Sequence, residues 1–182
     1  MSRINSLWYT VMDSPIGEIC IAATTRGVCW ISFEGAEAAK LPLKRWGKKW
    51  LLCENIVLET TPLLDEAVKQ LQEYFQGERK QFDLPLDIYG SPFQKLVWEQ
   101  LRRIPYGEIR TYKDIALAIS AGKAVRAVGG ANNRNPLSII VPCHRVIGSN
   151  GALVGYGGGL GIKEFLLQLE SVDLGNNQRK AQ

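Results

Sequence analysis

The residues best suited to covalent chemistry lie together in the segment 135–146, which reads NPLSIIVPCHRV. The segment begins as a buried strand, and Pro142 interrupts it directly before Cys143, so the thiol is expected at a backbone irregularity. His144 and Arg145 are basic neighbours that would lower the pKa of Cys143, and a thiolate is the competent nucleophile. The segment therefore predicts nucleophilic chemistry at Cys143.

The histidine beside this thiol is the only one in the chain. Adjacent side chains of a regular strand point to opposite faces, so a direct hydrogen bond between Cys143 and His144 is not implied. Either the backbone turns at this point or a water molecule connects the two groups. A single histidine also excludes any metal site with two His ligands, and the cysteines are widely spaced, so neither a metal nor another cofactor is expected.

The other three cysteines, Cys20, Cys29 and Cys53, lie on or near apolar strands. A chain of 182 residues in a reducing compartment does not need disulfides to hold its core, so these residues are interpreted as buried structural thiols. No apolar run approaches the roughly 20 residues that span a bilayer. The sequence is therefore expected to be a cytoplasmic globular protein without a membrane segment.

The charge is distributed unevenly along the chain. Residues 1–90 carry 10 Lys and Arg against 12 Asp and Glu, whereas residues 91–182 carry 12 against 6. A basic second half fits attraction to nucleic acid phosphates, but it also fits an ordinary solvated basic face. Charge alone does not decide between these two interpretations.

The elements of the first half predict a sheet covered by a helix. Thr61 followed by Pro62 marks the start of a helix whose apolar residues repeat at helical spacing until Gly77. The stretch 34–54 contains a cluster of Lys, Arg and Trp residues and is expected to be a solvated, partly helical excursion without an assigned function. Three short strands at hairpin spacing form a meander before it: 7–12, 18–23 and 28–33.

The second half predicts a helical domain that follows a connector over 78–90. Ser91 and Pro92 begin one helix. Thr111 begins another, with Asp114 at the third position in a weak form of the capping box. A break at residues 120–122 precedes a short helix over 123–129, and the last two helices have the spacing of a helix-turn-helix.

The second helix of this pair offers only Lys123 and Arg126 as long polar side chains among small residues. Reading of bases in the major groove usually needs more such side chains, so this helix suits close packing in a minor groove with little sequence discrimination. Two short helices joined by glycine are also common as part of an ordinary helical core, so the pattern alone leaves that alternative open.

Several motifs occur together in one order: residues 104–107 (IPYG), 126–131 (RAVGGA), 135–136 (NP), 142–146 (PCHRV) and 155–159 (GYGGG). In this combination the chain resembles the O6-alkylguanine-DNA alkyltransferase family, densely over residues 91–170 and only in its sheet-plus-helix pattern before them. The resemblance implies an α/β (α+β) protein. Its expected domains are a ribonuclease H-like N-terminal domain over 1–88, with an antiparallel sheet and a helix, and a winged helix-turn-helix domain over 89–182.

The resemblance also implies roles for catalytic residues. Cys143 resembles the alkyl acceptor, His144 the base that deprotonates it through a water molecule, and Glu170 the carboxylate that orients the histidine. Asn135 resembles the side chain that ties the active-site turn together, and Tyr112 the phenol that helps to rotate the nucleotide and donates a proton to O6. Without the resemblance, Glu170 reads as a solvated glutamate near the end of a helix.

Further positions resemble the family's DNA-binding and base-binding residues. Arg126 corresponds to the finger that fills the vacated stack, and Lys123 and Ala127 lie on the same helix. Tyr156 and Gly157 belong to the binding loop, where some relatives carry serine in place of Gly157. The backbone carbonyls of Val141 and Cys143 would accept from the guanine amine.

The expected function is irreversible transfer of an alkyl group from O6-alkylguanine, and from O4-alkylthymine, in double-stranded DNA to the protein's own cysteine. Such a protein acts once per molecule, as a monomer bound through the minor groove, after flipping the lesion base. Two other classes stay open. One is a DNA-binding regulator or lesion-sensing adaptor without transfer, and the other is a thiol hydrolase with a Cys143–His144 dyad.

Overall fold

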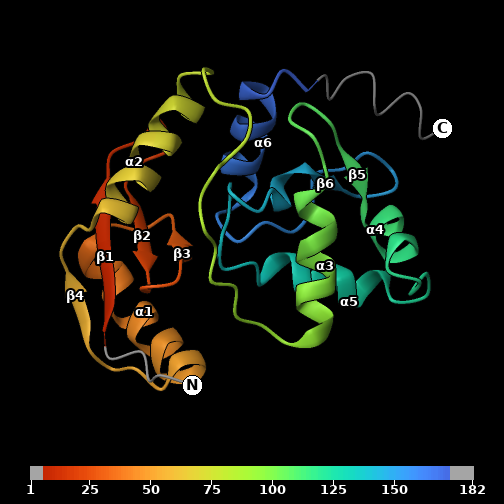
Figure 1. Ribbon diagram of the computed structural model, residues 1–182. Coiled ribbons are helices and arrows are strands. Elements are labelled where there is room, and N and C mark those ends of the chain that lie inside the picture. Colours follow the sequence, from red (N-terminus) through yellow and green to blue (C-terminus); the bar gives the residue numbers. More distant parts are fainter. Residues whose placement is uncertain (1–5, 173–182) are drawn as a thin grey trace. The chain divides into compact units, whose positions relative to one another are not determined.

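The computed structural model describes residues 6–172, and the chain divides into two compact units, Met1–Tyr89 and Gly90–Gln182 (Figure 1). The first unit is a four-stranded mixed sheet with two helices, and the second is mainly helical. No helix within residues 6–172 is long and apolar enough to cross a membrane.

The sheet of the first unit has the strand order β3-β2-β1-β4. β1 (Leu7–Met12), β2 (Ile19–Ala23) and β3 (Val28–Ser32) form the expected antiparallel meander. The sequence did not indicate the short β4 (Ile56–Leu58), which pairs in parallel with β1. Gly27, just before β3, lies so close to the backbone of residues 85–87 that a Cβ would come within 2.7 Å of the Pro85 carbonyl oxygen. Only glycine allows this close approach.

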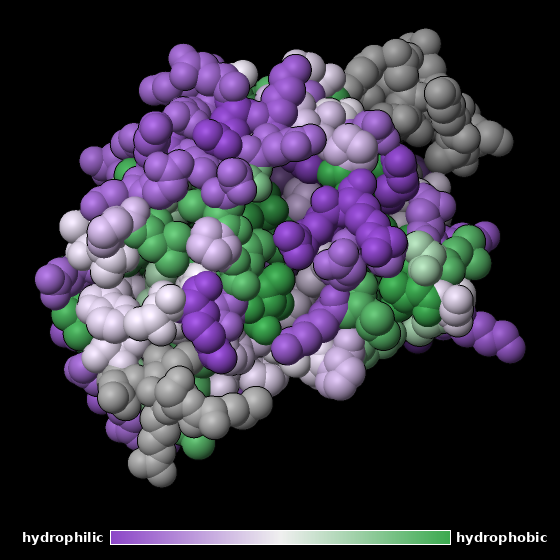
Figure 2. All heavy atoms as spheres, viewed as in Figure 1, coloured by the Kyte–Doolittle hydropathy of each residue, from purple (hydrophilic) through white to green (hydrophobic). Residues whose placement is uncertain are grey.

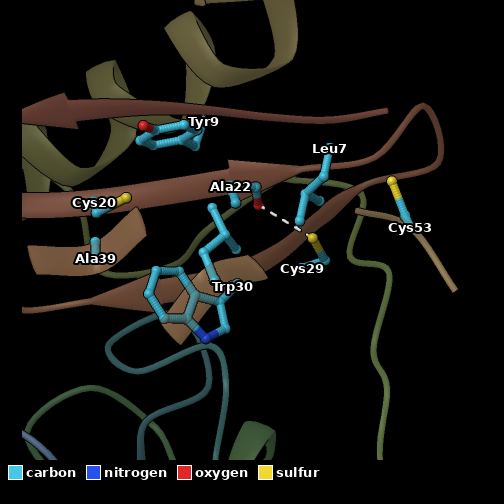
Figure 3. Close-up of a cluster of buried hydrophobic side chains, with 9 residues drawn as sticks. Leu7, Tyr9, Cys20, Ala22, Cys29, Trp30, Ala39 and Cys53 are labelled. Atoms are coloured by element: carbon cyan, nitrogen blue, oxygen red, sulfur yellow. Dashed lines mark hydrogen bonds between the residues drawn. The ribbon is translucent and has the colours of Figure 1, made fainter. Parts of the chain in front are cut away.

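The sheet is covered by two helices. All five residues of β2 are buried, and alternate side chains of a strand face opposite sides, so both faces of the sheet need cover. α1 (Ala36–Leu51) packs Ala39 and Leu43 into a cluster with residues of β1–β3 (Figure 3). In this cluster the Cys29 thiol donates to the Ala22 carbonyl at 3.4 Å, as a structural thiol does.

α2 (Pro62–Phe75) contacts β1, β2 and β3 and covers the second face. Its start is set locally, because the Thr61 side chain accepts from the Leu64 N–H and Pro62 occupies the first turn. Figure 2 shows hydrophilic side chains gathered over the upper left of the view, where Figure 1 places α2. The outcome for the stretch 34–54 differs from the expectation of a partly helical excursion. Most of this stretch forms the regular 16-residue α1, which contains Pro42.

The second unit begins with α3 (Pro92–Arg102), whose Ser91 and Gln94 form a capping box. α4 (Tyr112–Ala118) begins with the second capping box, between Thr111 and Asp114, as the sequence predicted. α5 spans Val125–Asn133, so it begins two residues later and ends four residues later than expected. The unit also contains a 3₁₀ turn at Cys143–Arg145 (η1), α6 (Leu160–Leu169), and the short parallel pair β5 (Arg110–Thr111) and β6 (Val146–Ile147).

Candidate active site

The candidate nucleophile lies at the end of a tight loop. The expectation of a buried strand before Pro142 was wrong, because residues 137–141 form no strand beyond one isolated bridge between Ser138 and Val141. Ile139 adopts φ +75°, a left-handed conformation rare for a β-branched residue, and the chain folds back so that the Val141 N–H donates to the Leu137 carbonyl at 2.8 Å. The apolar residues are buried as expected, but in a turn rather than in a sheet.

Asn135 links the two ends of this loop. Its Nδ2 donates to the Val141 carbonyl at 2.7 Å, and its Oδ1 accepts from the Leu137 N–H at 3.0 Å. The Val141 carbonyl also accepts from the Cys143 N–H at 2.8 Å. The loop is therefore held by hydrogen bonds directly before the thiol.

Cys143 begins the 3₁₀ turn η1 and is only 2% exposed. The backbone does turn between Cys143 and His144, so the two side chains are not on the opposite faces that a regular strand would give them. His144 is fully buried and its Nε2 lies 2.8 Å from Oε1 of Glu170, the residue that ends α6. The alternative of a solvated Glu170 is wrong, because this residue is 2% exposed.

Glu170 accepts hydrogen bonds from His144, Arg145 and Gly107. Besides His144, the Arg145 guanidinium donates through Nε to Oε2 at 2.8 Å and through Nη2 to Oε1 at 2.9 Å, in the bidentate geometry that suits a carboxylate. The Gly107 N–H donates to Oε2 at 3.1 Å. Burial by itself raises the pKa of Glu170, but the hydrogen bonds and charges of His144 and Arg145 outweigh it and lower the pKa to about 2.

This ionised carboxylate determines the state of His144. A carboxylate can only accept, so the proton of the neutral ring is on Nε2 and Nδ1 carries a lone pair. Burial lowers the pKa of His144 below its ordinary value, although Glu170 acts in the opposite direction, so the ring is neutral near pH 7. Within residues 6–172, the buried Nδ1 has no hydrogen-bond partner and is available as a base.

The expectation that His144 and Arg145 lower the pKa of Cys143 was wrong. Burial raises the pKa of the thiol, and hydrogen bonds from Asn135 and Ser138 and the charge of Lys163 only partly offset it. Arg145 does not act on the thiol, because its guanidinium is occupied by Glu170 and by the Ile104 carbonyl. The resting group is therefore a thiol that needs a base.

Tyr112 lies near this thiol, and burial together with the Cys143 charge raises its pKa to about 12. Its hydroxyl lies 2.9 Å from the Val154 carbonyl and accepts from Asn132 Nδ2 at 3.4 Å. Asn132 also donates to the Cys143 carbonyl at 3.4 Å. A protonated phenol is thereby held between α4, α5 and the loop that follows β6.

Lys163 is a functional candidate that the sequence analysis missed. Its side chain is fully buried, and its ammonium donates to the carbonyls of Val146 and Val154, the latter at 2.8 Å. Burial lowers the pKa of this group to about 8, while the Cys143 charge acts to raise it. A lysine between apolar residues of a helix is usually interpreted as a surface residue. Only the fold shows that Lys163 holds the loop after β6, near Tyr112, in place.

The remaining candidate residues lie at the surface or in the loop after β6. Arg126 and Ala127 are exposed on α5, and Lys123 is exposed just before it. Tyr156 is buried, and burial and the Cys143 charge raise its pKa well above the ordinary value. Gly157 is exposed, and a Cβ there would meet only the Asn133 carbonyl at 3.6 Å, so a side chain would fit.

Two family models match the chain. Residues 7–88 match the ribonuclease-like domain of 6-O-methylguanine DNA methyltransferase, and residues 92–172 match its DNA binding domain. A methylated-DNA–protein-cysteine methyltransferase of Methanosarcina barkeri is 48% identical over 92% of this chain and 99% of its own length. The chain belongs to this methyltransferase family. The constitutive protein of that name from Bacillus subtilis is 49% identical over 91% of this chain and 96% of its own length.

Solved structures agree with this family assignment. The O6-methylguanine methyltransferase of Mycobacterium tuberculosis is 41% identical, aligns over 90% of this chain and 92% of its own with a TM-score of 0.75, and has also been crystallised in complex with DNA. The mixed α/β architecture, with an N-terminal sheet and a C-terminal helical DNA-binding domain, is therefore confirmed.

In this family member, the buried carboxylate should dominate the stability of the second unit. We expect Glu170→Gln to lower the free energy of unfolding by about 3–5 kcal/mol at pH 7, because Arg145 stays buried without its counter-charge. The folded pKa of Glu170 is lower than its unfolded value, so this contribution is present above about pH 4.5 and decreases as the pH falls toward 2. Urea unfolding at several pH values measures it.

The exposed Glu164 on the same helix provides the matched control, and Glu164→Gln should stay within about 0.5 kcal/mol of wild type. Equal unfolding curves for wild type and Glu170→Gln at pH 7 would show that the buried ion pair contributes nothing.

Proposed function

We propose that this protein repairs DNA by transferring the alkyl group of O6-alkylguanine to Cys143. The observation that supports it most strongly is the buried series Cys143, His144 and Glu170 in a domain that matches a DNA-binding family model. A sulfur–carbon bond forms while the bond between the alkyl carbon and O6 breaks, and guanine leaves with the electron pair. The product is a thioether on the protein and an unmodified base.

The proton of the thiol moves to His144 in this proposal. The raised pKa of Cys143 leaves little spontaneous thiolate at neutral pH, so the base must act in the same step. Nδ1 of His144 is the buried acceptor, reached through a water molecule, and Glu170 holds the opposite nitrogen in its protonated form. Tyr112 remains protonated at neutral pH and gives its proton to O6 as guanine leaves, and the proton held by His144 then returns to the phenolate through solvent, so that both groups are neutral again.

The lesion base has to leave the duplex to reach this thiol. Cys143 is 2% exposed, and a base inside a stacked duplex cannot approach a group so deeply buried, so we propose that the nucleotide is flipped out. The exposed side of α5, with Arg126 and the small Ala127, enters the minor groove together with Lys123 just before the helix, and Arg126 fills the vacated stack. The loop with Tyr156 and Gly157 receives the flipped base. The backbone carbonyls of Val141 and Cys143 are the proposed acceptors for the guanine amine, and the Val141 carbonyl also supports the loop by accepting from Asn135.

The reaction ends with the protein consumed. A thioether has no easy hydrolytic exit at neutral pH, so each molecule acts once. The same displacement applies to O4-alkylthymine, whose alkyl carbon is bonded to an equivalent oxygen. One chain supplies all of these residues, which suits a monomer, and its four free thiols suit a reducing compartment such as the cytoplasm.

The first test replaces the nucleophile. Cys143→Ala should abolish transfer and leave the affinity for duplex DNA within about threefold, because phosphate contacts, not the thiol, supply most of the binding. Mass spectrometry after incubation with an O6-methylguanine duplex should show one added methyl group on Cys143 in the wild type. Label on Cys20, Cys29 or Cys53, or tight binding without any transfer, would instead support a lesion-sensing protein.

The role of His144 predicts a particular pH dependence. The lowered pKa of His144 keeps its ring neutral, so the wild-type transfer rate should stay level down to below about pH 6.5 and fall only when the ring is protonated. His144→Gln should be slower by about 10²–10⁴-fold at pH 7 and should recover as the pH rises and thiolate forms without a base. Single-turnover rates measure both. A parallel pH profile for the two proteins contradicts the relay.

Arg126 should affect the flipped state more than the initial complex. We expect Arg126→Ala to slow repair by a larger factor than it weakens duplex binding. Binding loses only one contact among several, whereas the flipped state loses the side chain that fills the vacated stack. Binding titrations and single-turnover rates on the same duplex give the two factors, with Arg134→Ala as an exposed control just beyond α5. Selection of a strong consensus from random duplexes would favour a sequence-specific regulator over the repair function.

A further inference from the structure

α1 concentrates the positive charge of the first unit. Residues 1–90 contain ten Lys and Arg residues, and five of these lie inside α1, in the ten-residue stretch 40–49: Lys40, Lys44, Arg45, Lys48 and Lys49. All five side chains belong to exposed residues. The same 90 residues carry 12 Asp and Glu, so the basic helix stands out from an otherwise acidic unit.

These five residues, called the α1 basic surface, are arranged as neighbours of like charge. Lys40, Lys44 and Lys48 follow one another at intervals of four residues, and Arg45 and Lys49 form a second row of the same kind. Like charges at this spacing destabilise a helix. An ordinary solvated helix alternates the signs instead, as α3 does by pairing Glu99 with the arginines that follow it at 102 and 103.

Few carboxylates offset this surface. Glu54 pairs with Lys48 at 2.8 Å, and Lys44 acts on the same carboxylate at longer range. Within residues 6–172, Lys40 and Arg45 have neither an ion pair nor a hydrogen bond of their side chains. The repulsion along α1 is therefore only partly relieved inside the protein, and an external polyanion would relieve the rest.

A hollow of about 410 Å³ lies beside α1 and is lined by Glu37, Lys40, Leu41, Lys44, Glu54, Asn55 and Ile56. Its two lysines are balanced by two glutamates, so the hollow is not itself an anion pocket. A small phosphate ligand would gain little there. The five exposed cations of α1 exceed these two carboxylates by three charges, and they extend along the helix, which suits an extended polyanion. The row from Lys40 to Lys48 is about 12 Å long at 1.5 Å per residue.

We propose that the α1 basic surface is a second DNA-binding site that contacts the sugar-phosphate backbone without reading bases. One strand of a duplex carries a phosphate about every 3.4 Å of axis, so a 12 Å row faces about three or four of them. The inference rests on the proposed function only for the choice of DNA as the polyanion. An anionic membrane is less suitable, because the apolar side of α1, including Ala39 and Leu43, is buried against the sheet and cannot insert.

The test measures the salt dependence of binding to an undamaged duplex with the full chain. Lys40→Gln/Lys44→Gln should reduce the slope of log affinity against log salt by about 1.8, since each lost phosphate contact contributes about 0.9. The variant and the wild type should therefore differ most at about 50 mM salt and converge at higher concentrations. Lys69→Gln/Lys80→Gln removes the same charge elsewhere in the unit and should leave the slope within about 0.3 of wild type.

A second readout separates this proposal from the proposed function. Transfer from a free O6-alkylguanine base needs no DNA, so the α1 variant should react with it at the wild-type rate. Absence of transfer from both the free base and an O6-methylguanine duplex in the wild type would refute the repair function, whereas an unchanged salt slope in the α1 variant, or an equal change in the control, would refute the second DNA site. Loss of binding to phosphatidylserine vesicles with an unchanged DNA slope would assign the surface to membranes instead.

Discussion

The buried carboxylate of Glu170 is the interaction on which the second unit depends. It ends α6 and receives hydrogen bonds from His144 and Arg145 in the 3₁₀ turn and from the Gly107 N–H before β5. Three segments that are far apart in the sequence are thereby fixed to one side chain. A charge buried in this way is tolerated only with its partners in place, so the position of the turn after Cys143 follows from the fold of the whole unit.

The same carboxylate gives Arg145 and His144 different roles. Arg145 neutralises it and so prevents burial from protonating it, and the ionised group then holds the His144 ring with its proton on Nε2. Burial raises the pKa of Cys143 and lowers that of His144, which brings the thiol and the base to their uncharged forms before reaction. Charges are consequently created only when the thiol is deprotonated, in a site from which bulk water is largely excluded.

The sequence predicted those elements whose structure depends on residues nearby in the chain. It did not predict the elements whose structure depends on residues far away in the sequence. The helix starts at Thr61, Ser91 and Thr111 were predictable because each cap satisfies backbone groups within one turn. β4 was missed because three residues have no periodicity and gain their partner from β1, about 50 residues away. Residues 137–141 suggested a strand because they are apolar, but the hydrogen bonds of Asn135 fold them into a loop. The use of Arg145 and Lys163 inside the protein could not be read from their types, since such side chains are usually exposed.

The Lys and Arg residues of this chain fall into two groups: buried ones that bond to the protein itself, and exposed ones that can bind an external anion. Arg145 and Lys163 are buried, and each has its donors satisfied by a carboxylate or by backbone carbonyls, so neither has a charge to offer to an external anion. The cations of α1 and the arginine of α5 are exposed, and an exposed cation can exchange its counterions for phosphates. Binding energy from phosphates is therefore independent of the charges that set the state of Cys143 and His144. A substitution at the surface can then change affinity for DNA without altering the chemistry of the thiol, and this separation makes the two properties measurable in the same protein.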